Sequence, residues 1–303
     1  MEKLLKELNA NIKLSNQLSY QILMSNIISN LDIDSKDKEI LLLLLQARDR
    51  NYIRINNNEQ CYQNIISYLN LIQPLELPLC DLLRIGGNGD GGYVMYNGEG
   101  YMSNIDAKAL SLGVSDSSPW DLEMAQRGFK ASIEKCPYNH ENIVFHKKFI
   151  GNTNNENTIT LAQALKDNNL DESKSNILQC DIENCEWDML ENIDISILNK
   201  YFSQVIFEFH GCNPEEQDGF EKRISLLKKI NEYFVPIHTH FHNHGKIFYS
   251  QGLFFSTTLE VSYLRKNLIN LNIVKYRDVA GGFKNLDFPW VSNPEIPIRF
   301  RGY

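Results

Sequence analysis

The sequence has no basic region, no long hydrophobic run and no Cys-x-x-Cys pair. Its 38 Asp and Glu residues outnumber its 30 Lys and Arg residues, and the formal net charge of -8 argues against nucleic acid as a partner. The longest apolar run, residues 40–45, is far too short to cross a bilayer. The first seven residues mix charges with leucines and predict no secretion signal. We therefore expect a cytoplasmic protein without a transmembrane segment.

None of the six cysteines belongs to a Cys-x-x-Cys pair, which is the spacing typical of zinc sites and redox-active disulfides. Two of the cysteines lie within apolar runs of strand length. This usage predicts buried, reduced thiols in a cytosolic protein.

Glycine and proline are absent from residues 1–73. Leucine and isoleucine recur there at helical spacing, as at Leu4, Leu8 and Ile12. Residues 32–35 interrupt this pattern and supply a helix N-cap. We therefore predict an extension of three helices, which either forms a lid on its own domain or pairs with a second copy in a homodimer. Binding to a membrane surface is less favoured, because the polar face carries charges of both signs.

From residue 74 onward, short apolar runs alternate with helical segments, which predicts a mostly parallel sheet covered on both faces. The expected strands are residues 109–114, 130–134, 143–149, 176–181, 204–210, 235–242 and 259–264. The last two strands follow each other without a helix and predict a terminal antiparallel hairpin. The predicted fold class is therefore α/β, with one Rossmann-like domain over residues 74–303 built on a mostly parallel seven-stranded sheet.

Two consecutive strands end in acids or a histidine, Asp181-Ile182-Glu183 and Glu208-Phe209-His210. The carboxyl ends of parallel strands form the ligand crevice of such a sheet, so these side chains are expected to face a bound molecule. We predict that His210 is a general base, because its ordinary pKa lies near neutrality. Glu208 would orient it or bind a divalent ion, and Asp181 would contact the cofactor or that ion.

The first strand ends in Gly113-Val114-Ser115, a turn that supplies backbone N–H groups to a ligand. There is no Gly-x-Gly-x-x-Gly motif, which argues against NAD or FAD. Glu134 ends the next strand, 21 residues after Gly113 (134 − 113), where related sheets hold ribose hydroxyls. A ribose-binding acid without phosphate-binding glycines indicates a nucleoside without phosphates, so S-adenosylmethionine is the expected cofactor.

Five glycines occupy the seven positions 86–92. Such a segment is typical of a hairpin with left-handed residues, or of a loop that lies close over a cofactor. In the second case Arg84, Asp90, Gly92 and Tyr93 would contact the amino-acid end of the cofactor.

His238, His240 and His242 alternate along a predicted strand and therefore share one face of it. This row indicates either a metal cluster or a row of hydrogen-bonding groups that lines a sugar pocket. In the second case these histidines, together with Asn243 and Glu260, would bind the substrate. In the first case the protein would be a metal-dependent hydrolase or lyase.

Several short motifs follow one another between residues 80 and 290. They are Arg84-x-Gly86 with Asp90-Gly91-Gly92-Tyr93-Val94, Ser111-Leu112-Gly113 with Trp120-Asp121, Asp181-Ile182-Glu183 with Glu186-Trp187, Glu208-x-His210, His240-x-His242-Asn243 and Leu259-Glu260-Val261. As an ordered set they resemble the FkbM-related methyltransferase-like domain of S-adenosylmethionine-dependent methyltransferases. His244 and Asn184 depart from the pattern, since Asn and Gly are commoner at those two positions.

The resemblance implies a Rossmann-like fold and methyl transfer to oxygen, in surface-polysaccharide pathways such as capsule or lipopolysaccharide biosynthesis. The expected acceptor is a sugar or nucleotide-linked sugar. A Mg²⁺ ion held by Asp181 and Glu208 is an alternative way to activate its hydroxyl. A non-catalytic module that binds carbohydrate or a partner protein is the non-enzymatic alternative.

Overall fold

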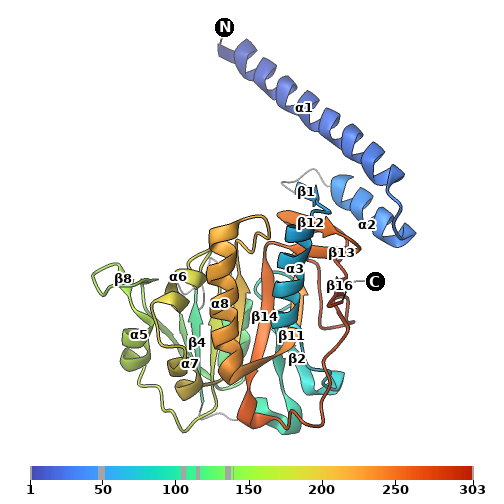
Figure 1. The fold of residues 1–303 in the computed structure, drawn as a ribbon. Helices are drawn as coiled ribbons and strands as arrows, with labels where there is room; N and C mark the ends of the chain where they lie inside the picture. Colours follow the sequence, from blue (N-terminus) through green and yellow to red (C-terminus); the bar gives the residue numbers. More distant parts are fainter. Residues whose placement is uncertain are drawn as a thin grey trace.

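A mixed seven-stranded sheet lies at the centre of the body, in the order β11-β14-β10-β9-β4-β5-β6 (Figure 1). Its strands are β4 (Lys108–Leu112), β5 (Lys130–Ile133), β6 (Ile143–Phe145), β9 (Asn176–Cys180), β10 (Phe202–Phe209), β11 (Phe234–Phe241) and β14 (Leu259–Arg265). The five strands from β10 to β6 pair in parallel, whereas β14 runs antiparallel to both β10 and β11. The carboxyl ends of β4, β9 and β10 therefore meet at one edge.

The computed structural model describes residues 2–46, 52–103, 107–113, 117–133, 138 and 140–301. Three residues predicted to bind the cofactor, Val114, Ser115 and Glu134, lie outside the described residues.

The predicted fold class, a single Rossmann-like and mostly parallel sheet with a terminal hairpin, is wrong. The described strands divide among five sheets, and β11 and β14 form no hairpin. Between them the chain forms β12 (Lys246–Ser250) and β13 (Leu253–Ser256), which pair with each other and, through β12, with β1 (Tyr52–Ile55). The reason is local: residues 247–249 and 253–255 are two more apolar runs, and the left-handed residues Gln251 and Gly252 turn the chain between them.

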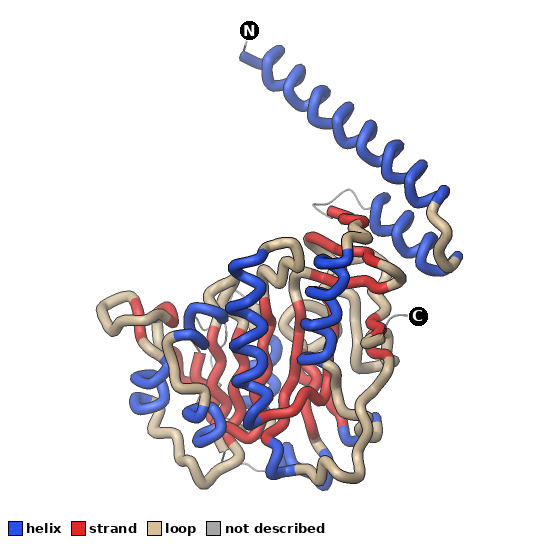
Figure 2. The backbone as a smooth tube through the Cα atoms, in the orientation of Figure 1, coloured by secondary structure: helices blue, strands red, loops and turns tan. Residues whose placement is uncertain are grey.

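Neighbouring residues of the central strands face opposite sides of the sheet. Leu178 and Phe207 belong to one core cluster, and Ile177 and Ile206 belong to another. This alternation is the period of two expected for a strand, and the burial of both clusters means that both faces are covered. Figure 2 shows helices α3 and α8 beside the strands on one side, and Trp120 of α4 packs into the cluster on the other side.

Helices and short strands complete the described body. The helices are α1 (Glu2–Asn30), α2 (Ser35–Gln46), α3 (Glu59–Ile72), α4 (Pro119–Gln126), α5 (Leu161–Asp167), α6 (Glu186–Glu191), α7 (Ser196–Tyr201) and α8 (Gln217–Tyr233). The short strand pairs are β2 (Leu82–Ile85) with β3 (Tyr93–Tyr96), β7 (Phe149–Ile150) with β8 (Thr158–Ile159), and β15 (Val279–Ala280) with β16 (Ile298–Arg299). The glycine-rich segment connects β2 to β3, so the hairpin interpretation of residues 86–92 is confirmed.

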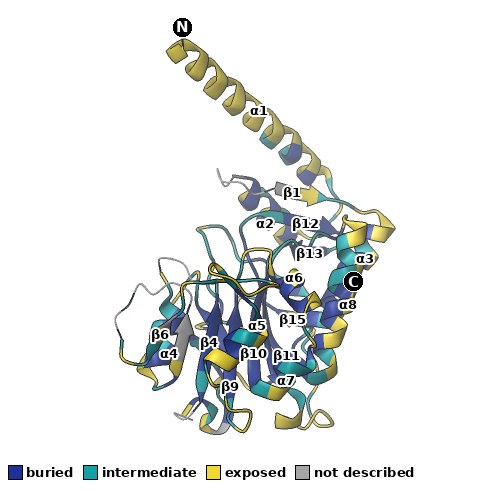
Figure 3. Ribbon diagram, turned by 90° about the vertical axis from the view of Figure 1, so that its left-hand side faces the viewer, coloured by how far each residue is buried: buried dark blue, intermediate teal, exposed yellow. Residues whose placement is uncertain are grey.

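The described part of the first 72 residues contains the three predicted helices and one strand, β1, that was not predicted. α3 packs against α8 and β1 pairs with β12, so this part of the extension belongs to the body. α2 is anchored by Asp37, which is buried and pairs with the Arg299 guanidinium at 2.8 and 2.9 Å. α1 instead projects from the body, and its surface is largely exposed (Figure 3). None of the described helices combines the length and apolar character needed to cross a membrane.

Candidate functional site

A cavity of about 1310 Å³ opens at the carboxyl ends of β4, β9 and β10. It brings together seven residues that the sequence predicted as site residues: Asp90, Tyr93, Gly113, Asp181, Glu208, His210 and His242. Most of them meet because parallel strands end on the same edge of the sheet. Gly113 follows β4, Asp181 follows β9, and Glu208 and His210 lie at the end of β10.

Gly113 sets the contact between the ends of β4 and β9. Its backbone is left-handed, with φ +85°, and a Cβ atom at this position would overlap the carbonyl oxygen of Asp181. The Asp181 N–H donates to the Leu112 carbonyl oxygen at 2.9 Å. Only glycine allows this close approach, which positions Asp181 at the cavity.

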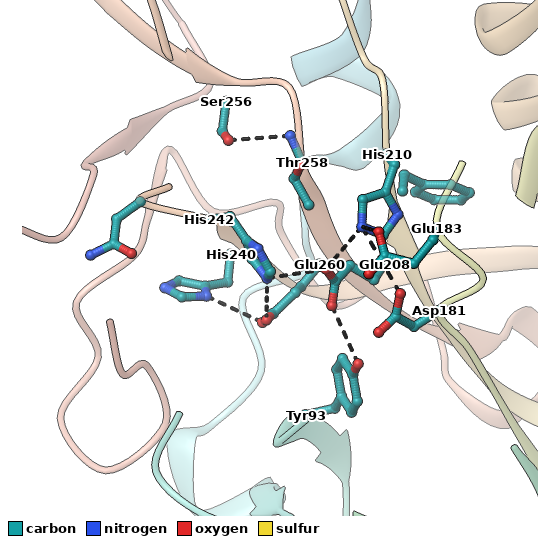
Figure 4. A network of polar contacts seen from close by, with 12 residues as sticks. Tyr93, Asp181, Glu183, Glu208, His210, His240, His242, Ser256, Thr258 and Glu260 are labelled. Atoms are coloured by element: carbon teal, nitrogen blue, oxygen red, sulfur yellow. Dashed lines mark hydrogen bonds and ion pairs between the residues drawn. The ribbon is translucent and has the colours of Figure 1, made fainter. Parts of the chain in front are cut away.

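His210 lies among four carboxylates, of which Figure 4 shows those of Asp181, Glu183 and Glu208. Its Nδ1 atom is 3.1 Å from Glu186 Oε1, and its Nε2 atom is 3.2 Å from Glu208 Oε1. On the cavity side, Nε2 is also 3.6 Å from Glu183 Oε2 and 4.0 Å from Asp181 Oδ1.

These carboxylates control the charge of His210. Burial works against the imidazolium, but hydrogen bonds with Glu186 and Glu208 outweigh it and raise the pKa of His210 to about 11. Burial and the neighbouring charge of Glu208 raise the pKa of Asp181 to about 8. The protein groups by themselves therefore hold His210 as a cation at neutral pH, and it can act as a base only after that proton has left.

The same pattern of acids and histidines continues from Glu208 and His242 at the cavity to Glu260 and His240, which do not line it. Glu208 and Glu260 are directly opposite each other on β10 and β14, and both are buried. His242 Nε2 lies 3.0 Å from Glu260 Oε1 and 3.5 Å from Glu208 Oε1. His240 bridges Glu260 Oε2 at 3.2 Å and Glu295 Oε2 at 2.9 Å.

Burial opposes the charged form of both histidines, yet the adjoining carboxylates raise the pKa of His242 to about 9 and that of His240 to about 10. Two like charges opposite each other on a sheet are unfavourable, so the protonated histidines are what stabilises the buried Glu208 and Glu260.

The three alternating histidines do not converge on one point. His238 Nε2 lies 2.8 Å from Asp287 Oδ1, whereas His240 and His242 both pair with Glu260. Among the described residues, the groups able to hold a metal ion are Asp181 with Glu183 and His210, and Glu208 with His242 and Glu260. A hydrolase that uses the His238, His240 and His242 row as one metal cluster therefore finds no support in the geometry.

Several residues predicted to contact ligands contact the protein instead. The Arg84 guanidinium donates to the carbonyl oxygens of Gly87, Gly89 and Leu286, so it shapes the glycine-rich loop. Gly92 packs against Gly87 and Arg84 in the same loop. Asn243 donates to the carbonyl oxygens of Val291 and Asn293 and holds the C-terminal segment. None of these three, nor His238, His240 or Glu260, lines the cavity.

A polar network that the sequence did not predict lies on the other side of Glu208. Tyr93 donates to Glu208 Oε2 at 3.3 Å, and Gln179 donates to the Tyr93 hydroxyl at 3.3 Å. Ser111 donates to Gln179 Oε1 at 2.7 Å and also contacts Asp121, which is buried at the start of α4. Gln179, within the apolar run of β9, could have indicated this network, because a buried amide needs hydrogen-bond partners.

Asp121 lines the cavity, and its Oδ1 atom is buried without a hydrogen-bond partner. Burial raises the pKa of Asp121 to about 7, although the Ser118 hydroxyl donates to its other oxygen and contact with Ser111 also opposes the rise. The pKa of Asp121 is higher in the folded than in the unfolded protein. Between the two pKa values, the folded protein therefore keeps a proton that the unfolded protein loses. The free energy of unfolding therefore falls as pH rises from 3.8 to about 7, and it stays low above that.

Asp121→Asn should remove this pH dependence, because the amide does not ionise. We expect the variant to be more stable than the wild type by on the order of 3 kcal/mol at about pH 8, with little difference at about pH 4. Urea unfolding at the two pH values measures this. An equal change at both would contradict the assignment of the unfavourable charge to Asp121.

Comparison with protein-family models, with curated proteins and with solved structures finds no match to this chain. Its function is therefore inferred from the chemistry of the site.

Proposed function

We propose that this protein is an S-adenosylmethionine-dependent methyltransferase that acts on a hydroxyl group of a sugar or nucleotide-linked sugar. One observation carries the proposal: a single cavity joins the Gly113 turn to the acids and His210 at the ends of β9 and β10. A glycine turn after the first parallel strand suits a nucleoside cofactor, and carboxylates beside a histidine suit a hydroxyl that must lose its proton.

The residues present fit such a cofactor and a second ligand together. The cavity of about 1310 Å³ exceeds the roughly 300–1,000 Å³ of a pocket for one ligand. Gly113, Asp90, Tyr93 and Asp181 would hold the cofactor, which supplies a methyl group already activated on a sulfonium. The protein then has to align the acceptor hydroxyl and remove its proton, and Asp181, Glu208 and His210 are the groups in position for this.

Lysine residues on the same cavity favour a nucleotide-linked acceptor. Lys147 and Lys148 line it together with the acids of the strand ends. Ammonium groups bind phosphate, whereas carboxylates and histidine suit sugar hydroxyls, so one cavity offers both kinds of contact. Surface-polysaccharide biosynthesis, as in capsule or lipopolysaccharide pathways, is the setting that the motif resemblance favours. A cytoplasmic location stays a prediction.

Binding of the cofactor product tests the proposal most directly. S-adenosylhomocysteine at about 100 times its dissociation constant should stabilise the native state by about 2.7 kcal/mol and raise the melting temperature accordingly. NAD, at equal concentration, is the control and should give no shift. Incubation with labelled methyl donor and a panel of nucleotide-linked sugars then identifies the acceptor. No shift with either the methyl donor or its product would rule out the proposal.

We also propose that two copies of the chain pair through α1. Apolar side chains along this helix are exposed in the single chain, among them Leu4 at 71%, Leu8 at 54% and Ile22 at 64%. The polar residues include both charges, as in the Lys6–Glu2 pair, which suits a second copy of the helix better than an anionic membrane. Light scattering should give a dimer for the full chain and a monomer for Leu8→Glu with Ile22→Glu. A monomeric wild type would contradict the pairing.

A further inference from the structure

One nitrogen of His210 faces three carboxylates at the strand-end side of the cavity. Its Nε2 atom lies 3.2 to 4.0 Å from oxygens of Glu208, Glu183 and Asp181. A single N–H can point well at only one acceptor, so one proton cannot satisfy three oxygens. The ligand atoms of Asp181, Glu183 and His210 all lie within 4.8 Å of one another. Oxygen ligands of one ion, at about 2.1–2.4 Å from it, are likewise at most about 4.8 Å apart.

The other nitrogen of His210 is held in the way that metal-binding histidines usually are. Nδ1 lies 3.1 Å from Oε1 of Glu186, and the Glu186 side chain is completely buried. A carboxylate on one imidazole nitrogen fixes the orientation of the ring and directs the other nitrogen toward a cation. Ile182 N–H donates to the same Glu186 oxygen at 2.9 Å, which fixes the carboxylate in turn.

Two carboxylate oxygens at this place have no hydrogen-bond partner. Asp181 Oδ1 and Glu186 Oε2 are both buried and make no hydrogen bond. A buried carboxylate oxygen without a donor is costly, and an ion bound at this place would supply the missing partner. Asp181 Oδ1 is also one of the oxygens that face His210 Nε2.

We propose that Asp181, Glu183 and the Nε2 atom of His210 bind one divalent metal ion at the end of the cavity, and that the ion displaces the proton of this nitrogen to solvent. Glu186 is a positioning residue for His210, and Glu208 lies beside the ion. Binding of the ion stands on this geometry alone. Its role, which is to hold the acceptor hydroxyl and lower the pKa of that group, rests on the proposed methyl transfer.

The donor set favours a first-row transition ion over Mg²⁺. Mg²⁺ prefers oxygen ligands and retains its water, whereas an imidazole nitrogen with carboxylates suits Mn²⁺, Fe²⁺ or Zn²⁺. Mn²⁺ is the most useful probe, because it accepts both ligand types and is visible by electron paramagnetic resonance.

The second candidate group, Glu208 with His242 and Glu260, is less suited to an exchangeable ion. Its three side chains are buried, and Glu260 is already paired with two histidines, His240 and His242. Glu183, in contrast, has a side chain that is 83% exposed, so an ion and an acceptor can reach the first group from the cavity.

Titration of the chelator-treated full chain with Mn²⁺ tests the proposal. Calorimetry should give one site per chain, with Mg²⁺ binding at least about tenfold more weakly. Pulsed electron paramagnetic resonance of the wild type should detect one coupled imidazole nitrogen, a result that depends on no variant. No saturable Mn²⁺ binding, or binding without a coupled nitrogen, would overturn the proposal.

Substitutions of single residues identify which side chains bind the ion. Asp181→Asn and His210→Gln should each weaken Mn²⁺ binding by at least about tenfold, and Glu186→Gln should weaken it by about 10–100-fold although Glu186 is not a ligand. Glu156→Gln is the matched control, because Glu156 lines the same cavity outside the group, and its affinity should be unchanged. Loss of binding in Glu260→Gln, with Asp181→Asn binding normally, would assign the ion to the second group and refute the proposal. Circular dichroism confirms that each variant is folded.

Mn²⁺ binding and S-adenosylhomocysteine binding, measured on the same protein, test the metal site and the methyltransferase function separately. Binding of S-adenosylhomocysteine without Mn²⁺ binding rejects the metal site and retains the methyltransferase. Mn²⁺ binding without any binding of S-adenosylhomocysteine retains the metal site and rejects the methyltransferase.

Discussion

His210→Ala is expected to lower methyl transfer by a factor of about 10²–10⁴ while S-adenosylhomocysteine binds with nearly unchanged affinity. His210 contacts the side chains of Glu186, Glu208, Glu183 and Asp181, whereas Gly113 meets Asp181 through the main chain. The variant therefore removes a group from the acceptor side of the cavity and leaves Gly113, Asp90 and Tyr93 of the proposed cofactor side unchanged. The loss is expected whether His210 takes the proton of the hydroxyl or holds an ion beside it.

Stability changes in the same variant and has to be measured with activity. Glu186 and Glu208 are buried, and without His210 they lose the cation that pairs with them, at a cost of on the order of 3 kcal/mol. Assays therefore have to be run well below the melting temperature. His146→Ala is the matched control, since His146 contacts Asn168 and does not line the cavity. Equal losses of methyl transfer and of product binding would show that His210 had been assigned to the wrong ligand.

Gly113→Ala is expected to abolish both ligand binding and methyl transfer. The added Cβ atom would overlap the Asp181 carbonyl oxygen, and the backbone φ of +85° is unfavourable for alanine. We expect the free energy of unfolding to fall by at least about 2 kcal/mol, with the end of β9 displaced from β4. Because Asp181 follows β9 directly, its side chain would leave its place beside His210.

Gly89→Ala provides the control for this variant. Gly89 lies in the glycine-rich loop, where a Cβ atom would meet nothing within 4 Å and the backbone is not left-handed. Thermal unfolding and calorimetry with S-adenosylhomocysteine should give values close to those of the wild type. A Gly113→Ala protein as stable and as active as Gly89→Ala would mean that the ends of β4 and β9 do not depend on this contact.

The apolar runs of the sequence predicted the strands but not their full arrangement. The runs at residues 176–181 and 204–210 correspond closely to β9 and β10, because strands buried on both faces are continuous in hydrophobicity. Hydrophobic runs alone do not show whether the last two strands form a hairpin or are separated in the chain by another pair of strands. β12 and β13 provide that insertion, and their partner β1 comes from the part of the chain predicted to be helical.

Likewise, the sequence predicted some residues of the candidate site but not all of their contacts. Asp181, Glu208 and His210 were predicted from their positions at strand ends, and they lie on one cavity. His238 and His242 share a strand face in the sequence pattern, yet one pairs with Asp287 and the other with Glu260. Asp287 and Glu295 were not predicted, because the C-terminal segment reaches the sheet only through tertiary packing.

The sequence by itself determined which residues end the central strands, since the change from apolar to acidic residues is local and needs no knowledge of neighbours. Only the tertiary structure decided the charge of those residues. Without a bound ion, His210 is a cation because the fold brings Asp181, Glu183 and Glu186 of the segment after β9 within 4.0 Å of it, beside Glu208 at the end of β10. A histidine's pKa depends on such distances and on exclusion of water, and neither is encoded in the residues adjacent to it in the chain.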